Sequence, residues 1–135
     1  MLAERGDAAL AAEALEEAGA RIADAGLESA PVEEAIGRIV RALVAVGDHY
    51  SVLVLERVRC DAEAIERLLA EPMRRVFQRA LDEGLLRDDL PLDIQLELFG
   101  GTLQAGTRIA SERRLGLEDA AAAVTSAYLD GARRR

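Results

Sequence analysis

The sequence predicts an all-α protein, a bundle of about six helices, on three observations. Ala, Leu, Glu and Arg dominate its 135 residues, and all four favour helix. Apolar residues recur every three or four positions, which is the spacing of one helix face. Aromatic residues make up only 3% of the chain and clusters of β-branched residues are rare, so strands are not favoured. The length fits one domain, and we expect residues 1–135 to form a single helical unit.

The first two helices are expected at residues 7–25 and 31–47. A narrow apolar stripe runs along the first, and Gly26 follows it as a stop signal. The second opens at Pro31, which suits the first turn of a helix. Glu33 and Glu34 come next, where the helix dipole favours acids. A wide apolar face then continues to Gly47.

Residues 48–58 fit a strand or a helix by composition, because residues 52–55 form an unbroken apolar run. The sequence offers no second strand to pair with this run, and a lone strand would leave its backbone groups without partners. We therefore predict a short helix over residues 48–58.

Three further helices are predicted in the second half of the chain. Asp61 is a good N-cap for a helix over residues 61–84, which Pro72 should kink near residues 68–72. Residues 85–90 connect it to a long helix over residues 91–114, which carries two apolar faces and therefore needs two packing partners. The last helix is predicted over residues 117–132.

Glycines inside the helix at 91–114 indicate a close helix–helix contact. Gly100, Gly101 and Gly106 each cost about 1 kcal/mol relative to Ala, which a close approach of another backbone would offset. We expect the last two helices to form a four-helix bundle with a second copy of the chain. The alternatives are packing within one chain, or a kink at Gly100–Gly101. The residues expected at the dimer interface are Leu98, Gly101, Thr102, Ala105, Ile109, Ala121, Val124 and Tyr128.

Charge and composition exclude several classes of protein. The net charge is −8 and the only basic run is Arg133–Arg135, so the chain by itself is a poor nucleic-acid binder. Its apolar stretches fall far short of the roughly 18 residues that span a membrane. Nothing at the N-terminus resembles a signal peptide, so a cytoplasmic location is expected.

No catalytic residue, cofactor or metal site is predicted. The sequence has no phosphate-binding loop, no Gly-x-Ser-x-Gly motif and no second histidine beside His49. The single Cys60 excludes an intramolecular disulfide and a cysteine-cluster metal site. His49 and Cys60 lie eleven residues apart, a spacing that fits no standard zinc ligand set. We expect His49 to be a partly exposed side chain or a hydrogen-bond donor to a ligand, and not a metal ligand. A redox role for Cys60 is disfavoured, because the neighbouring Asp61 should raise the pKa of its thiol.

Three passages resemble transcription regulators of the tetracycline-repressor (TetR) type. Residues 80–91, ALDEGLLRDDLP, are similar to a passage of that family in which a helix ends at Gly and a Leu-Arg-x-Asp connector precedes a long helix. Residues 96–103, LELFGGTL, resemble the start of the family's dimerisation helix. Residues 31–35, PVEEA, resemble the opening of its fifth helix.

The resemblance implies the C-terminal half of such a regulator, which binds a small-molecule effector and forms a homodimer. The helix-turn-helix domain that reads DNA in this family is missing from the chain, so DNA binding is expected only through a domain outside it. The sequence leaves open whether that absence is natural or a truncation.

The resemblance also implies an effector pocket between the middle helices. The pocket is expected to be mostly apolar with few polar groups, which suits a hydrophobic or amphipathic effector. Its expected lining residues are Ile39, Leu43, His49, Tyr50, Leu53, Leu69, Met73, Phe77, Phe99 and Leu103. Two alternatives remain: these side chains are ordinary core, and the chain is a helical interaction or scaffold module without a small-molecule site.

Overall fold

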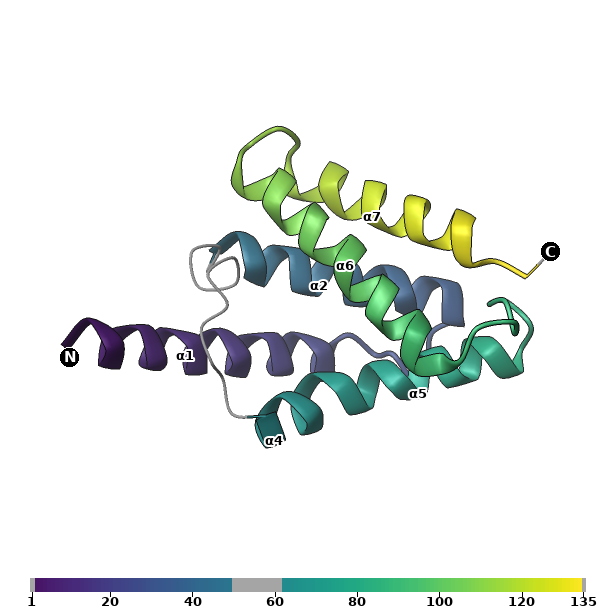
Figure 1. The fold of residues 1–135 in the computed structure, drawn as a ribbon, viewed down its shortest axis with the longest axis horizontal. Coiled ribbons are helices and arrows are strands. Elements are labelled where there is room, and N and C mark those ends of the chain that lie inside the picture. Colours follow the sequence, from purple (N-terminus) through teal and green to yellow (C-terminus); the bar gives the residue numbers. More distant parts are fainter. Residues whose placement is uncertain (1, 50–61, 135) are drawn as a thin grey trace.

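In a computed structural model of the chain, residues 2–49 and 62–134 are described, and they form helices without any strand (Figure 1). The elements are α1 (Leu2–Asp24), α2 (Val32–His49), α4 (Ala62–Ile65), the π-helix η1 (Glu66–Ala70), α5 (Glu71–Asp82), α6 (Leu92–Ser111) and α7 (Leu117–Ala132). Because α4, η1 and α5 follow one another without a break, the described residues form five helical rods. The all-α prediction is confirmed for this part of the chain.

Most predicted helix limits agree with the structure to within a few residues. The predicted helix over 48–58 is the exception: residues 48–49 end α2, and residues 50–58 lie outside the described part. The helix expected over 91–114 ends at Ser111, where a turn begins that contains Arg113 at a positive φ of 57°. The last helix has the predicted limits.

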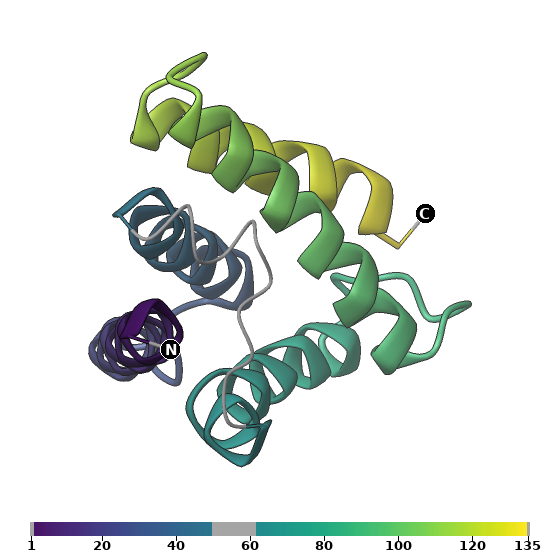
Figure 2. The same ribbon diagram turned by 60° about the vertical axis from the view of Figure 1, so that its left-hand side comes forward.

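Helix α2 is the centre of the fold, because it packs against α1, α5, α6 and α7. In Figure 2, α1 lies on one side of α2 and the hairpin of α6 and α7 on the other. Four side chains of α2 are buried almost completely: Ile36, Ile39, Val40 and Val44. A helix with several partners needs a wide apolar face, which is what the sequence of this segment provides.

Near Pro72, where a kink was predicted, the structure has a π-helix over residues 66–70. The backbone N–H of Glu71 donates to the carbonyl of Glu66, five residues back, instead of four. Pro72 has no N–H to donate and its ring crowds the carbonyl four residues earlier, so a wider turn at this point accommodates it. Residues 66–70 therefore join two α-helical segments without ending the rod.

The connector before α6 is more ordered than its sequence suggests. Leu86 is fully buried, and it forms an antiparallel bridge with Arg133 just beyond α7. The N–H of Arg87 donates to the carbonyl of Ala132 over 2.7 Å, and the N–H of Arg134 donates to the carbonyl of Leu85 over 3.1 Å. These bonds join the end of α7 to the connector between α5 and α6.

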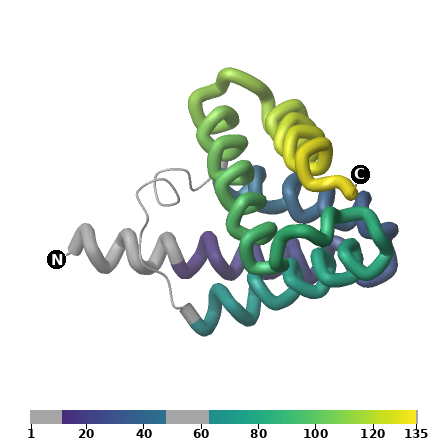
Figure 3. Tube along the Cα trace, turned by 45° about the vertical axis from the view of Figure 1, so that its right-hand side comes forward, coloured from purple at the N-terminus to yellow at the C-terminus, as the bar shows by residue number. Residues whose placement is uncertain are grey.

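The three interior glycines of α6 have different surroundings. A Cβ at Gly106 would collide with Cγ2 of Val124, so this glycine allows α6 to approach α7 within one chain. A Cβ at Gly100 or Gly101 would have no neighbouring atom within 4 Å. Packing within one chain therefore explains why residue 106 is a glycine. It does not explain Gly100 and Gly101, which have no such neighbour in the described part. Figure 3 shows α6 and α7 lying side by side along this contact.

The contrast gives a stability prediction. We expect Gly106→Ala to lower the free energy of unfolding by about 1–2 kcal/mol, because overpacking outweighs the gain in helix propensity. We expect Gly37→Ala in α2 to raise it by about 0.5–1 kcal/mol, since its methyl group would lie 3.9 Å from Cγ2 of Thr125, an ordinary contact distance. Urea denaturation followed by circular dichroism measures both. Adding Val124→Ala should rescue part of the Gly106→Ala loss, and strict additivity of the two changes would contradict the close contact.

Candidate functional site

The described residues of the predicted effector pocket belong to the hydrophobic core. Ile39, Phe77 and Phe99 are buried almost completely. Four others are partly buried and pack against the same core: Leu43, Leu69, Met73 and Leu103. Tyr50, Leu53 and the side chain of His49 lie outside the described part. The structure thus places the described members in or against one hydrophobic core.

Aromatic rings fill the space between α5, α6 and α7. The ring centroids of Phe77 and Phe99 are 4.9 Å apart, and Tyr128 of α7 lies 5.1 Å from Phe99 and 5.9 Å from Phe77. Edge-to-face packing at these distances is favourable and leaves little room between the rings. For Phe77 and Phe99 the structure therefore favours the alternative reading, ordinary core, because each is covered by the other and by Tyr128.

The hydroxyl group of Tyr128 also has a hydrogen-bond partner inside the protein. Its hydroxyl donates to the backbone carbonyl of Gln95 over 3.3 Å, and burial raises the pKa of Tyr128 to about 12. The Gln95 side chain is buried too, and its amide donates to the carbonyls of Arg87 and Leu90 over 2.8 and 3.0 Å. Tyr128 and Gln95 thus join α7, α6 and the connector as neutral hydrogen-bonding groups.

A groove of about 650 Å³ lies on another side of the molecule, between α1, the turn that follows it, and the η1–α5 rod. Its volume is within the range of small-molecule sites. The apolar part of its lining is formed by Ile22, Ala23, Leu27, Leu68, Pro72 and Val76. Its charged lining residues are Glu28, Arg67, Arg75 and Arg79, and Gly19, Gly26 and Ser29 complete it.

This groove was not predicted from the sequence. None of the ten residues predicted for the pocket lines it. A signal was present, because Arg67, Arg75 and Arg79 are separated by multiples of four positions and therefore fall on one side of the predicted helix. Of the ten predicted residues, Met73 lines a different hollow of about 480 Å³ between α5 and α6.

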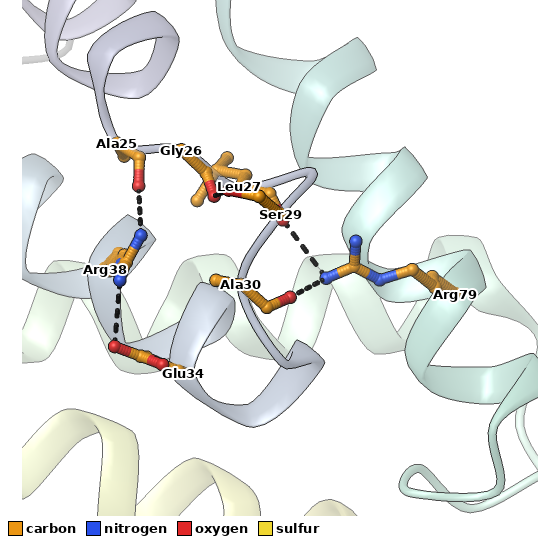
Figure 4. Close-up of polar contacts among 8 residues, drawn as sticks. All are labelled: Ala25, Gly26, Leu27, Ser29, Ala30, Glu34, Arg38 and Arg79. Atoms are coloured by element: carbon orange, nitrogen blue, oxygen red, sulfur yellow. Dashed lines mark hydrogen bonds and ion pairs between the residues drawn. The ribbon is translucent and has the colours of Figure 1, made fainter.

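Arg79 fixes the wall of the groove formed by the turn between α1 and α2 (Figure 4). Its guanidinium donates to three carbonyls of that turn, those of Leu27, Glu28 and Ala30, over 3.1, 2.9 and 2.6 Å. Its Nε has no hydrogen-bond partner but lies 3.6 Å from the carboxylate of Glu83. One side chain of α5 thus provides donors for three carbonyls of the turn that follows α1.

A second arginine holds the same turn from α2. Arg38 donates to the carbonyl of Ala25 over 2.7 Å and forms an ion pair with Glu34 over 2.9 Å (Figure 4). Gly26 follows with a φ of +65°, the left-handed conformation that commonly ends a helix. The hydroxyl of Ser29 donates back to the Gly26 carbonyl over 3.2 Å. The groove therefore has a well-fixed wall at this end.

We expect Arg79→Gln to lower the free energy of unfolding by about 2 kcal/mol, because partly buried carbonyls lose a charged donor. The matched control is Arg75→Gln, one turn earlier in the same helix, for which the described part shows no ion pair or side-chain hydrogen bond. We expect that change to stay within about 0.5 kcal/mol of wild type. Urea denaturation measures both, and equal effects would show that the carbonyl contacts of Arg79 do not stabilise the turn.

The predicted dimer face is partly uncovered. On α6, Ile94 is 41% exposed and Leu98 is 55% exposed, although both are large apolar side chains. Gly101 and Ala105 are exposed on the same helix, and Thr102 and Ile109 are half-buried. The two apolar faces predicted for this helix therefore differ: the face with Leu92, Leu96, Phe99, Leu103 and Ala110 packs against the core, and the other does not.

Helix α7 contributes small residues to this uncovered face. Leu98 and Thr102 of α6 share a shallow hollow of about 210 Å³ with Ala127 and Gly131 of α7. Ala127 and Gly131 are exposed, as are Ala122 and Ala123. We call the surface formed by Ile94, Leu98, Gly101, Ala105, Ala127 and Gly131 the α6–α7 face.

The structure corrects three residues of the predicted interface. Ala121, Val124 and Tyr128 are only 4%, 4% and 7% exposed, because they form the inner side of α7 and pack into the core. Their side chains face the rest of their own chain and are not available to a second copy. Any contact with a second copy would instead use the outer side of α7.

Exposed ion pairs surround the C-terminal end of α7. Arg133 pairs with Glu33, Arg134 with Asp88, and Arg87 with Asp89. Hydrogen bonds from the arginines lower the pKa of Glu33 and of Asp89. All these side chains are solvent-accessible, so each pair adds little to stability. All of them except Glu33 line a small polar hollow.

Within the described ranges, no helix is both long and apolar enough to cross a membrane, and no three His, Cys, Asp or Glu side chains are grouped to hold a metal ion. Comparison with protein-family models, with curated protein sequences and with solved structures finds no match.

Proposed function

We propose that this chain is the ligand-sensing and dimerising domain of a TetR-type transcription regulator, whose DNA contacts are made by a helix-turn-helix domain outside the chain. The observation that carries the proposal is the α6–α7 face. Leu98 is more than half exposed there, and Gly100 and Gly101 have no neighbour that explains the absence of a side chain. Large exposed apolar side chains beside small residues are typical of a helix–helix interface.

The groove beside α1 supports the sensing part of the proposal. It is formed by α1 on one wall and by η1 and α5 on the other, so an occupant touches both. An effector that binds one arrangement of these helices better than another shifts the population toward that arrangement. If the DNA-reading domain is attached through α1, such a shift changes operator affinity by linkage.

A second candidate is a helical interaction or scaffold module without a small-molecule site. The filled space between Phe77, Phe99 and Tyr128 favours it, because the predicted interior pocket is occupied by the protein's own side chains. In this alternative the α6–α7 face binds a different protein.

Two measurements on the purified chain test the proposal. Multi-angle light scattering at micromolar concentration should give the mass of a dimer, and a monomer would contradict the dimerisation part. A thermal-shift screen against apolar and amphipathic compounds tests sensing, since a ligand at 100 times its Kd adds about 2.7 kcal/mol of stability. A dimer that responds to no compound would favour the scaffold module.

A further inference from the structure

We propose that the groove between α1 and the η1–α5 rod binds an amphipathic anion, with a hydrocarbon chain on its apolar floor and a carboxylate held by Arg67 and Arg75. This inference rests on the proposed function, because it names the chemical class of the effector. It does not depend on the dimer.

The floor of the groove suits a hydrocarbon chain. Ile22 and Leu27 are buried at its base, and Leu68, Pro72 and Val76 face them from the η1–α5 rod. The two walls meet closely at one point, since a Cβ at Gly19 would lie 3.2 Å from Leu68. Leu68 and Pro72 are only partly buried, and covering such apolar surface with a ligand is favourable because it removes the surface from water.

The charges at the rim indicate the sign of the ligand. Among the described residues, ion pairs engage Arg74 and Arg79 of the same rod, but none engages Arg67 or Arg75. Glu28 is the one acidic residue among the lining residues. In a chain with a net charge of −8, this rim is a local excess of positive charge. A guanidinium donates two parallel hydrogen bonds to a carboxylate, which makes arginine well suited to such an anion.

The other hollows lack this combination. The hollow between α5 and α6 contains Asp93 and Glu97, and its single arginine, Arg74, is paired with Glu66. In the hollow at the end of α7, every arginine is paired with an acid. The π-helix contributes Arg67 and Leu68 to the groove at α1, and π-helical turns occur frequently at functional sites.

Titration with three probes of equal chain length tests the class of ligand. Decanoate, decanol and decyltrimethylammonium are added below their micelle concentrations and followed by isothermal titration calorimetry. We expect decanoate to bind most tightly and the cation most weakly. In NMR spectra, decanoate should shift the side-chain Nε–Hε signals of Arg67 and Arg75. Equal or tighter binding of the cation, or no binding of decanoate, would overturn the inference.

Variants then locate the site. Arg67→Gln combined with Arg75→Gln should weaken decanoate binding about tenfold and leave decanol binding unchanged, because only charge-assisted bonds are removed. Arg108→Gln combined with Arg114→Gln is the control, since it removes the same charge from exposed positions outside the groove. Ala23→Glu places an acid in the groove and should weaken decanoate binding by a similar factor. Unchanged binding by the groove variants would overturn the assignment.

The outcome is separable from the test of dimerisation. A monomer that binds decanoate in the groove would contradict the dimer and support this inference. A dimer that binds an uncharged or cationic compound, but not decanoate, would support the proposed function and overturn this inference.

Discussion

Replacing Phe77 by Ala is expected to lower the free energy of unfolding by about 3–5 kcal/mol. The side chain is 0% exposed, and its ring contacts those of Phe99 and Tyr128, so the truncation removes the centre of a three-helix contact. The two surrounding rings belong to separate helices and cannot both move into the space. A cavity would remain, and its cost adds to the lost burial of the ring.

Urea denaturation followed by circular dichroism measures this loss. Phe77→Leu replaces the alanine variant if that variant does not fold. We expect it to lose less than half as much free energy of unfolding as Phe77→Ala. Leu115→Ala is the control, because Leu115 is exposed in the turn before α7, and we expect a change within about 0.5 kcal/mol. A loss below about 1 kcal/mol for Phe77→Ala would mean that this ring is not part of a packed core.

The second large effect distinguishes the two sides of the α6–α7 hairpin. Ala121→Glu places a carboxylate at a position that is 4% exposed, without a cation to pair with it. We expect a loss of at least about 3 kcal/mol in the free energy of unfolding, because an unpaired charge is buried. Ala105→Glu changes an exposed position of α6. It should leave the helical circular dichroism spectrum intact and convert the dimer to a monomer in light scattering.

The matched control is Ala20→Glu on the exposed side of α1, which adds the same charge away from the α6–α7 face. We expect it to remain folded and dimeric. If Ala105→Glu also remained dimeric, the interface between copies would lie elsewhere. If Ala121→Glu folded as well as the control, the inner side of α7 would not be where the structure places it.

The helices were predictable because each carries its own signals along the sequence. Prolines and glycines mark the ends of α1, α2 and α6, and helix-forming residues fill the intervals. The two apolar faces of α6 were predictable too, since large side chains mark both. What their spacing does not show is which face the rest of the chain covers.

The two sides of α7 were harder to predict. Residues 120–123 are four alanines in succession, of which the first two are buried and the last two exposed. Four identical small side chains carry no periodic contrast, so the sequence does not show which of them face the core. Ala121 was assigned to the outer side for this reason. Val124 and Tyr128, three and seven positions later on the same side of the helix, were assigned with it.

The groove depends on contacts between distant parts of the chain. Its walls come from residues 19–29 and 67–79, and no local pattern shows that these segments lie together. The predicted pocket was assembled from apolar residues of the middle helices, yet such residues fill the interior by packing on one another. The spacing of Arg67, Arg75 and Arg79 by multiples of four was the better signal for this groove, because it places three cations on one side of the rod.

The fastening of the α1–α2 turn by Arg38 and Arg79 has a mechanical consequence. Helix α1 has 23 residues and is therefore about 35 Å long, with its fixed point at the turn. If α1 tilts about this turn as a rigid rod, a tilt of about 5° displaces its far tip by about 3 Å. A ligand that widens the groove near this turn would therefore displace the far end of α1 by a larger distance than the residues beside the ligand.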